Sequence, residues 1–126
     1  MKVRRKVLGD EYVNRSIARI KPHTREFQEL IVRYAWGVWS RPGLDFRSRR
    51  ILVLGTMVAL ARWEEFDMHA KAALEHGFSL NDIKEVLLQQ MVYCGVPVAN
   101  TAFNRLNAVI EELTSKGVVI KDLKHK

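Results

Sequence analysis

Three polar residues stand at helical spacing in the middle of the chain: Arg62, Glu65 and His69. Positions i, i+3 and i+7 lie along one face of an α-helix, so a cation, a carboxylate and an imidazole would line up there. An imidazole titrates near neutral pH and is a frequent general acid or base, and a neighbouring carboxylate favours its protonated form. The structural alternative is an ordinary surface pair between Glu65 and His69, and composition alone favours that alternative.

Four arginines lie within ten residues, beginning at Arg41. Guanidinium groups suit carboxylates because they donate two parallel hydrogen bonds, and the nearby Trp36 and Trp39 would lower the local dielectric. The alternative is a solvated basic first helical turn, with both tryptophans in the core. We favour this alternative for Arg47 and leave Arg41 open between the two interpretations.

Tyr93 stands just before a predicted helix break at Gly95 and could present its hydroxyl there. Cys94 is the only cysteine, which excludes an intrachain disulfide and agrees with a reducing compartment. The sequence has no metal-binding cluster of suitable spacing, no dinucleotide fingerprint, no P-loop and no Gly-x-Ser-x-Gly, so a metal or nucleotide enzyme is disfavoured. The remaining histidines have no matching partner pattern and are expected to be exposed: His23, His76 and His125.

The length and composition favour one soluble globular domain. The chain has 126 residues, 48% of them apolar, which suffices for one hydrophobic core. The longest apolar stretch, Ile51 to Ala61, is well short of the roughly 18 residues that suggest a membrane span. No apolar segment follows the basic N-terminus as in a secretory signal, so we expect a cytoplasmic protein without a membrane partner.

The net charge of +7 is concentrated at the two ends. Residues 1–21 carry seven Lys or Arg against two acidic residues, and residues 116–126 carry four Lys against one. The middle of the chain, 22–115, has ten basic and eleven acidic residues, so no basic stripe follows its helices. Nucleic-acid binding is therefore not expected.

The first half of the chain predicts three helices. Asp10 can cap a first helix over about 11–20, which ends before Pro22, and Thr24 can cap a second. A turn at Arg41-Pro42-Gly43 ends the second, and Asp45 can accept hydrogen bonds from the first turn of a third that runs to about Ala61. The predicted buried face of the second helix consists of Phe27, Leu30, Ile31, Tyr34 and Val38.

The second half predicts three more helices, which makes the chain all-α with about six helices. One spans 63–76 and ends at a left-handed Gly77, and the next starts at a Ser79-x-x-Asp82 pair that is close to a capping box. Pro97 suits the first turn of the last long helix. Helices 51–61 and 86–92 are apolar nearly all round, which suggests packing between subunits.

Five segments of the chain form a recognisable pattern: Trp39-Ser40-Arg41-Pro42-Gly43-Leu44-Asp45, Glu64-Glu65 with His69, Ala72-Ala73-Leu74, Ile83-Lys84-Glu85-Val86-Leu87-Leu88-Gln89, and Val92-Tyr93-Cys94-Gly95-Val96-Pro97-Val98-Ala99-Asn100. Together these segments resemble the carboxymuconolactone decarboxylase family, in the larger peroxiredoxin-like group related to the alkyl hydroperoxidase AhpD. The resemblance covers about residues 26–112 of a single domain, 1–126, with basic termini at 1–9 and 117–126. It implies an AhpD-like helical bundle that forms a homo-oligomer, typically a hexamer built as a trimer of dimers, with active sites near subunit contacts.

The chain departs from the redox members of that group, which carry Cys-x-x-Cys-x-x-x-His where it has Arg62, Glu65 and His69. Without a second cysteine, a peroxidase cycle through a dithiol is not available. A thiol-dependent antioxidant role would rest on Cys94 alone and is the alternative function. Two further function classes compete with catalysis by these residues, namely a non-catalytic oligomeric scaffold and a nucleic-acid binder that uses its basic ends.

The resemblance implies a decarboxylase that needs no cofactor and converts 4-carboxymuconolactone, a small lactone dicarboxylate, to the 3-oxoadipate enol-lactone in aromatic catabolism. We hypothesise that His69 donates the proton, that Glu65 orients His69 and keeps it protonated, and that Arg41 binds a carboxylate. A related decarboxylase acting on another small carboxylated substrate is also compatible with these residues. The other predicted substrate-binding residues are Arg49, Tyr93, Trp39 and Arg62.

Overall fold

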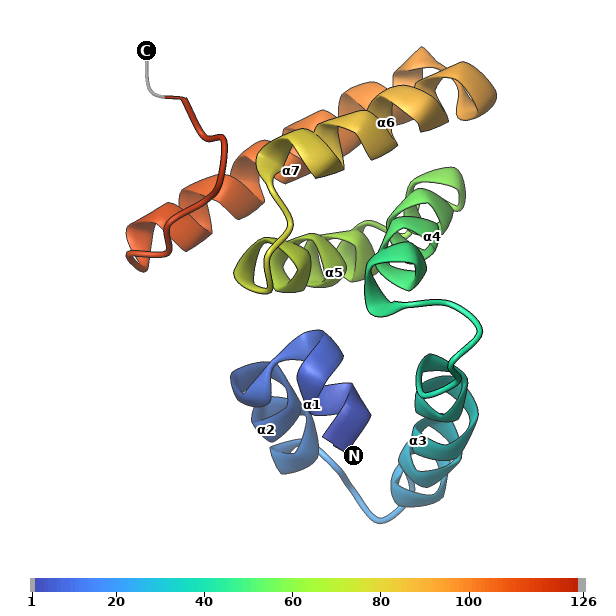
Figure 1. Ribbon diagram of the computed structural model, residues 1–126. Helices are drawn as coiled ribbons and strands as arrows, with labels where there is room; N and C mark the ends of the chain where they lie inside the picture. Colours follow the sequence, from blue (N-terminus) through green and yellow to red (C-terminus); the bar gives the residue numbers. More distant parts are fainter. Residues whose placement is uncertain (1, 125–126) are drawn as a thin grey trace. The chain divides into compact units, whose positions relative to one another are not determined.

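The computed structural model describes residues 2–124, and the predicted exposure of His125 falls outside this range. Within it the chain forms seven α-helices and no strand, which confirms the all-α prediction (Figure 1). The helix beyond the expected six is α1, which lies in the segment assigned as a basic terminus. None of these helices is long and apolar enough to cross a membrane. The helices are α1 (Lys2–Leu8), α2 (Asp10–Ala18), α3 (Arg25–Trp39), α4 (Phe46–Ala59), α5 (Trp63–Glu75), α6 (Leu80–Cys94) and α7 (Val96–Ser115).

The contacts between residues divide the chain into two compact units, which we describe separately. The first unit contains α1, α2 and α3 and extends to Arg49 in the first turn of α4. The second unit starts at Arg50 and contains the rest of α4 and helices α5 to α7. The number of domains stays a prediction.

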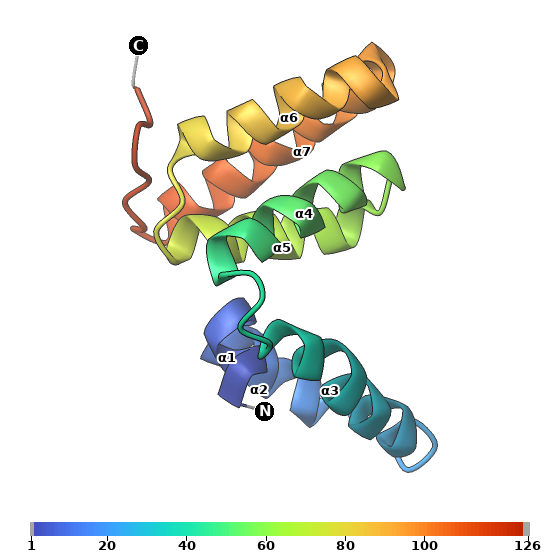
Figure 2. The same cartoon turned by 45° about the vertical axis from the view of Figure 1, so that its right-hand side comes forward.

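The second unit is built around α6 and α7, which run antiparallel and side by side (Figure 2). Ser79 and Asp82 form the predicted capping box at the start of α6. Gly95, at φ +101°, separates α6 from α7, where Pro97 occupies the first turn as predicted. One face of α5 and one face of α6 are buried. The largest fully buried side chains of this unit are Phe66, Leu54, Ile83, Leu87, Leu113 and Val58.

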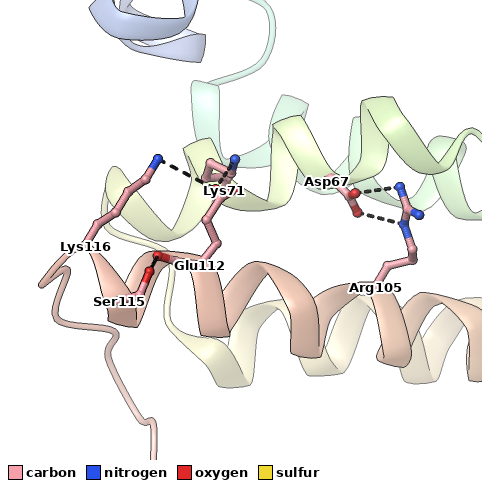
Figure 3. Close-up of polar contacts among 6 residues, drawn as sticks. All are labelled: Asp67, Lys71, Arg105, Glu112, Ser115 and Lys116. Carbon is pink, nitrogen blue, oxygen red and sulfur yellow. Dashed lines mark hydrogen bonds and ion pairs between the residues drawn. The ribbon is translucent and has the colours of Figure 1, made fainter.

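Polar pairs also join α5 to α7 (Figure 3). Arg105 donates from Nε and Nη2 to the two carboxylate oxygens of Asp67, at 3.1 and 2.6 Å. One turn further along α5, Lys71 forms an ion pair with Glu112. These pairs hold α5, the helix that carries the candidate catalytic residues, in a fixed position on α7.

A close backbone approach links α4 to α6. Gln90 on α6 donates from Nε2 to the carbonyl oxygen of Gly55 on α4, at 2.8 Å. A Cβ atom at position 55 would lie 3.1 Å from that nitrogen, so glycine leaves the space that the amide occupies. This contact fixes the position of α4 against α6 in the second unit.

The first unit places both tryptophans in its interior. Trp36 and Trp39 are stacked with ring centroids 6.0 Å apart, and Phe46 packs edge-on against Trp39 at 5.6 Å. Asp45 accepts a hydrogen bond from the Ser48 amide at 2.7 Å, as predicted for the start of α4. Thr24 does precede α3, but its hydroxyl bonds to the backbone of Lys21 and does not cap the helix.

The predicted buried face of α3 is wrong for the single chain. Phe27, Leu30, Tyr34 and Val38 are exposed, Tyr34 by 82%. The more polar face, with Arg25, Gln28, Glu29 and Arg33, lines a groove in the first unit instead. At 3.6 residues per turn these two sets lie on opposite sides of the helix. Apolar periodicity identified the helix correctly, but it could not tell which neighbour would cover the apolar side.

Candidate functional site

The residues of the candidate site lie at the start of α5. Arg62 is the residue that precedes this helix, and Glu65 and His69 follow in its first two turns. Phe66 and Ala70 turn toward the core and are fully buried, whereas Glu65 and Arg62 are exposed. His69 is partly buried beside the core residues. The helix therefore carries an imidazole at the border between core and solvent.

Arg50, on α4, is a buried cation that acts on this imidazole. Its side chain is 5% exposed, and burial lowers the pKa of its guanidinium. The positive charge of Arg50 in turn lowers the pKa of His69, while Glu65 raises it. The structure thus places both Arg50 and Glu65 within electrostatic reach of His69.

Arg50 had no specific role in the sequence interpretation, although it belongs to the predicted arginine cluster. The position of Arg50 relative to the apolar residues of α4 could have indicated that it is buried. Arg50, Leu54 and Val58 recur every four residues, so the arginine lies on the face of α4 that Leu54 and Val58 bury completely. A charged residue at the end of such a series is expected to be desolvated.

The pKa of His69 falls to about 4, first because the ring is buried, then because Arg50 is near, with Glu65 opposing both effects. The expectation that Glu65 keeps His69 protonated at neutral pH is therefore wrong for the free chain. No hydrogen bond joins the two side chains, and Nδ1 of His69 is buried without a hydrogen-bond partner among residues 2–124. His69 is a neutral imidazole with an available ring nitrogen.

A buried cation next to a neutral imidazole favours the binding of an anion. A carboxylate placed near both groups would be attracted by the positive charge of Arg50 and would favour protonation of His69. Substrate binding and proton uptake by His69 would then be coupled. The arrangement is suited to a reaction in which an anion enters and a proton is then delivered.

Three other predicted site residues belong to the first unit. Arg49 donates to the carbonyl oxygens of Leu44 and Arg41, at 3.2 and 3.1 Å, and so holds the turn between α3 and α4. Trp39 is 8% exposed and packed in the interior, in agreement with a core role for this residue. The Arg41 side chain is exposed and makes no hydrogen bond or ion pair within the described part of the chain.

Tyr93 and Cys94 stand at the end of α6. Tyr93 is 78% exposed, and the Cys94 thiol is free and half-buried. The predicted exposure of His23 and His76 is confirmed. Among the residues that the structure describes, no group of three His, Cys, Asp or Glu side chains could hold a metal ion.

Comparison with known proteins places the chain in one family. Residues 25–108 match the model of the carboxymuconolactone decarboxylase family. A nitrosuccinic acid decarboxylase of Metarhizium robertsii is 40% identical over 118 residues, which cover 93% of this chain and 82% of the relative. A 4-carboxymuconolactone decarboxylase of Acinetobacter baylyi is 37% identical over 114 residues, 90% of this chain and 85% of the relative. Both relatives are named as decarboxylases, and with the family match they show that the chain belongs to the carboxymuconolactone decarboxylase family.

Proposed function

We propose that the protein is a cofactor-independent decarboxylase of small dicarboxylates, with 4-carboxymuconolactone as its substrate. The observation that carries the proposal is the buried Arg50 beside the neutral His69. The 4-carboxymuconolactone decarboxylase of Acinetobacter baylyi, 37% identical over most of the chain, supports this choice of substrate.

The chemistry of this substrate explains why a cation and an acid would suffice. Its labile carboxylate stands on a saturated ring carbon that is joined through a C=C bond to the lactone carbonyl. When the carbon–carbon bond to the carboxylate breaks, CO2 leaves and the electron pair moves into the ring as a dienolate. A proton added to carbon then completes the enol-lactone product.

Arg50 is assigned to bind a carboxylate and to stabilise the developing negative charge, because a buried guanidinium interacts with anions more strongly than an exposed one. His69 takes up a proton from solvent when the dianionic substrate enters, since the incoming charge raises its pKa. It then donates this proton to the dienolate carbon and is reprotonated by water. Glu65 favours the protonated imidazole throughout this cycle.

The other predicted residues keep secondary roles in the proposal. Arg41 binds a carboxylate through its exposed guanidinium, and Arg62 attracts anionic substrates to the start of α5. Tyr93 is assigned to stabilise charge on the dienolate oxygen. Arg49 acts indirectly, because it holds the backbone carbonyl of Arg41. Trp39 supports the same turn from the interior.

The exposed apolar side of α3 supports a homo-oligomer, in which a second copy covers this surface. Exposed apolar patches of this kind usually mark contacts between proteins. Ile51, Leu52 and Leu60 on or next to α4, with Val92 at the end of α6, add further exposed apolar residues in the second unit. A hexamer arranged as a trimer of dimers is the assembly we propose.

Nitrosuccinate is the second candidate substrate, because the Metarhizium robertsii relative is 40% identical over most of the chain. Nitrosuccinate is also a small dicarboxylate with an electron-accepting group next to a carboxylate. Loss of CO2 from the carbon that bears the nitro group leaves a nitronate, which needs a proton on carbon. The same two residues, Arg50 and His69, would serve both reactions.

The test is CO2 release by the purified protein from each substrate, compared with the His69→Ala and Cys94→Ser variants. We expect turnover of 4-carboxymuconolactone, a loss of roughly a hundredfold or more in His69→Ala, and no loss in Cys94→Ser. Turnover of nitrosuccinate alone would favour the second substrate. Loss of activity in Cys94→Ser would point to a thiol-dependent function, and near-normal turnover by His69→Ala would refute the role of His69.

A further inference from the structure

A groove of about 720 Å³ lies within the first unit, among α1, the end of α2 and one side of α3. It involves neither His69 nor any of the residues predicted for the catalytic site. Three arginines, one carboxylate, one amide and three aliphatic side chains line it. These residues are Arg4, Arg25, Arg33, Glu29, Gln28, Ile17, Ile20 and Val32.

Arg4 is the most informative residue of the groove. Its side chain is only 6% exposed, and its single hydrogen bond within the described part of the chain runs from Nη2 to Oγ of Ser16, at 2.7 Å. Its Nε is buried without a hydrogen-bond partner among residues 2–124, and no carboxylate there forms an ion pair with it. A buried cation without a counter-charge is destabilising, so a site next to Arg4 favours an anion.

The other charges of the groove add to this preference. Arg25 and Arg33 follow each other at two-turn spacing on α3, with Glu29 between them. Glu29 forms no ion pair with a residue in the described range, so three cations face one carboxylate. The excess of positive charge lies next to the apolar surface of Ile17, Ile20 and Val32.

We propose that this groove binds a small organic molecule that carries a carboxylate on an apolar body. The guanidinium groups suit a carboxylate because their planar geometry matches its two oxygens. The aliphatic side chains would cover the rest of the molecule, since polar anchoring with apolar lining is the usual construction of a small-molecule site. The groove is thus a second anion site, independent of the proposed decarboxylase reaction.

The experiment is calorimetric titration of the full-length protein with octanoate, and with octanamide as the neutral analogue of equal length. We expect octanoate to bind and octanamide to bind at least roughly tenfold more weakly, because it lacks the charge that the arginines recognise. Arg33→Gln should weaken octanoate binding by about tenfold. Arg4→Gln should weaken it further, but because Arg4 is buried, the folding of this variant must be checked by circular dichroism.

Arg19→Gln is the matched control, because Arg19 is exposed in the same unit and does not line the groove. It removes the same charge and should leave octanoate affinity within twofold of the wild type. Equal weakening by Arg19→Gln and Arg33→Gln would overturn the proposal, since it would reflect only the net charge. The absence of octanoate binding at millimolar concentration, or equal binding of octanamide, would also overturn it. None of the residues proposed for decarboxylation lines the groove. Failure of the decarboxylase assay would therefore leave the octanoate result unchanged.

Discussion

Arg50 and His69 belong to the same buried region of the second unit, where the guanidinium cation lowers the pKa of the imidazole. The first cause of the low value, about 4, is burial of the ring, and the Arg50 charge adds to it. Burial and the Arg50 charge together therefore keep the proposed acid neutral until an anion binds. This relationship can be measured directly, without knowledge of the substrate.

Arg50→Gln is expected to raise the pKa of His69, because the substitution removes a like charge while the carboxylate of Glu65 remains. The pKa is measured by following the ring protons of His69 in an NMR pH titration. Arg62→Gln is the control, since Arg62 is exposed and is not among the causes of the His69 shift. An unchanged pKa in Arg50→Gln would mean that burial alone keeps the imidazole neutral.

The stability of the fold should depend on pH through His69. Its pKa is about 4 in the folded chain and 6.5 when unperturbed, so the unfolded chain binds more protons between these values. The contribution of His69 to the free energy of unfolding is therefore fully present above about pH 6.5. It is lost as the pH falls toward 4, and the loss is at most about 3 kcal/mol. Urea unfolding at pH 7 and pH 5, at constant protein concentration, should show a smaller loss of free energy in His69→Gln than in the wild type. Equal losses in both proteins would contradict the low pKa.

Helix positions were predictable from the sequence because their signals are local. The capping box at Ser79, the left-handed Gly77 and the Asp45 contact each depend on residues a few positions apart. The short helix α1 was missed because its seven residues are mostly basic and show no capping signal. Local chemistry thus predicts where helices start and stop better than it predicts a short charged helix.

The candidate site was less predictable, because its electrostatics depend on contacts between helices. The spacing of Glu65 and His69 suggested a carboxylate that keeps an imidazole protonated. Burial and the charge of Arg50 outweigh that carboxylate, and neither effect can be read from α5 alone. The apolar periodicity of α3 likewise identified its apolar side. It could not show which neighbour covers that side, because this too depends on contacts with other segments.

The ion pair between Asp67 and Arg105 should contribute modestly to stability. Its geometry is bidentate, but the two side chains are 32% and 37% exposed, so solvent screens the interaction. A double-mutant cycle with Asp67→Asn and Arg105→Met should give a coupling of about 0.5–1 kcal/mol in urea unfolding. Arg105→Lys should lose part of this coupling, because lysine cannot donate the two parallel hydrogen bonds. A coupling near zero would show that apolar packing alone fixes α5 on α7.

The exposed apolar side of α3 should be required for assembly of the proposed homo-oligomer. Tyr34→Glu places a charge in the middle of the exposed apolar surface, where burial against a second copy would desolvate it. Light scattering coupled to size-exclusion chromatography should therefore give a smaller molar mass for this variant than for the wild type. Asn14→Glu adds the same charge at an exposed position of α2 and should leave the mass unchanged. A wild-type mass for Tyr34→Glu would mean that another surface, or none, joins the copies.

The pH dependence of catalysis tests the proposed proton donor. If the protonated form of His69 is required, kcat/KM follows the fraction of free protein that carries this proton. With a pKa of about 4, this fraction decreases tenfold for each pH unit above that value, so kcat/KM should fall steadily between pH 5 and pH 8. The dianionic substrate raises the pKa of His69 in the complex, so kcat should stay constant to a higher pH than kcat/KM does.

Glu65→Gln gives the matched test of this explanation. Loss of the carboxylate lowers the pKa of His69 further, so the variant should have a lower kcat/KM than the wild type at every pH above 5, with the same slope. The measurement is initial rates of CO2 release at substrate concentrations far below and far above KM. A kcat/KM that does not change between pH 5 and pH 8 would show that water or another group supplies the proton, even if His69→Ala is inactive.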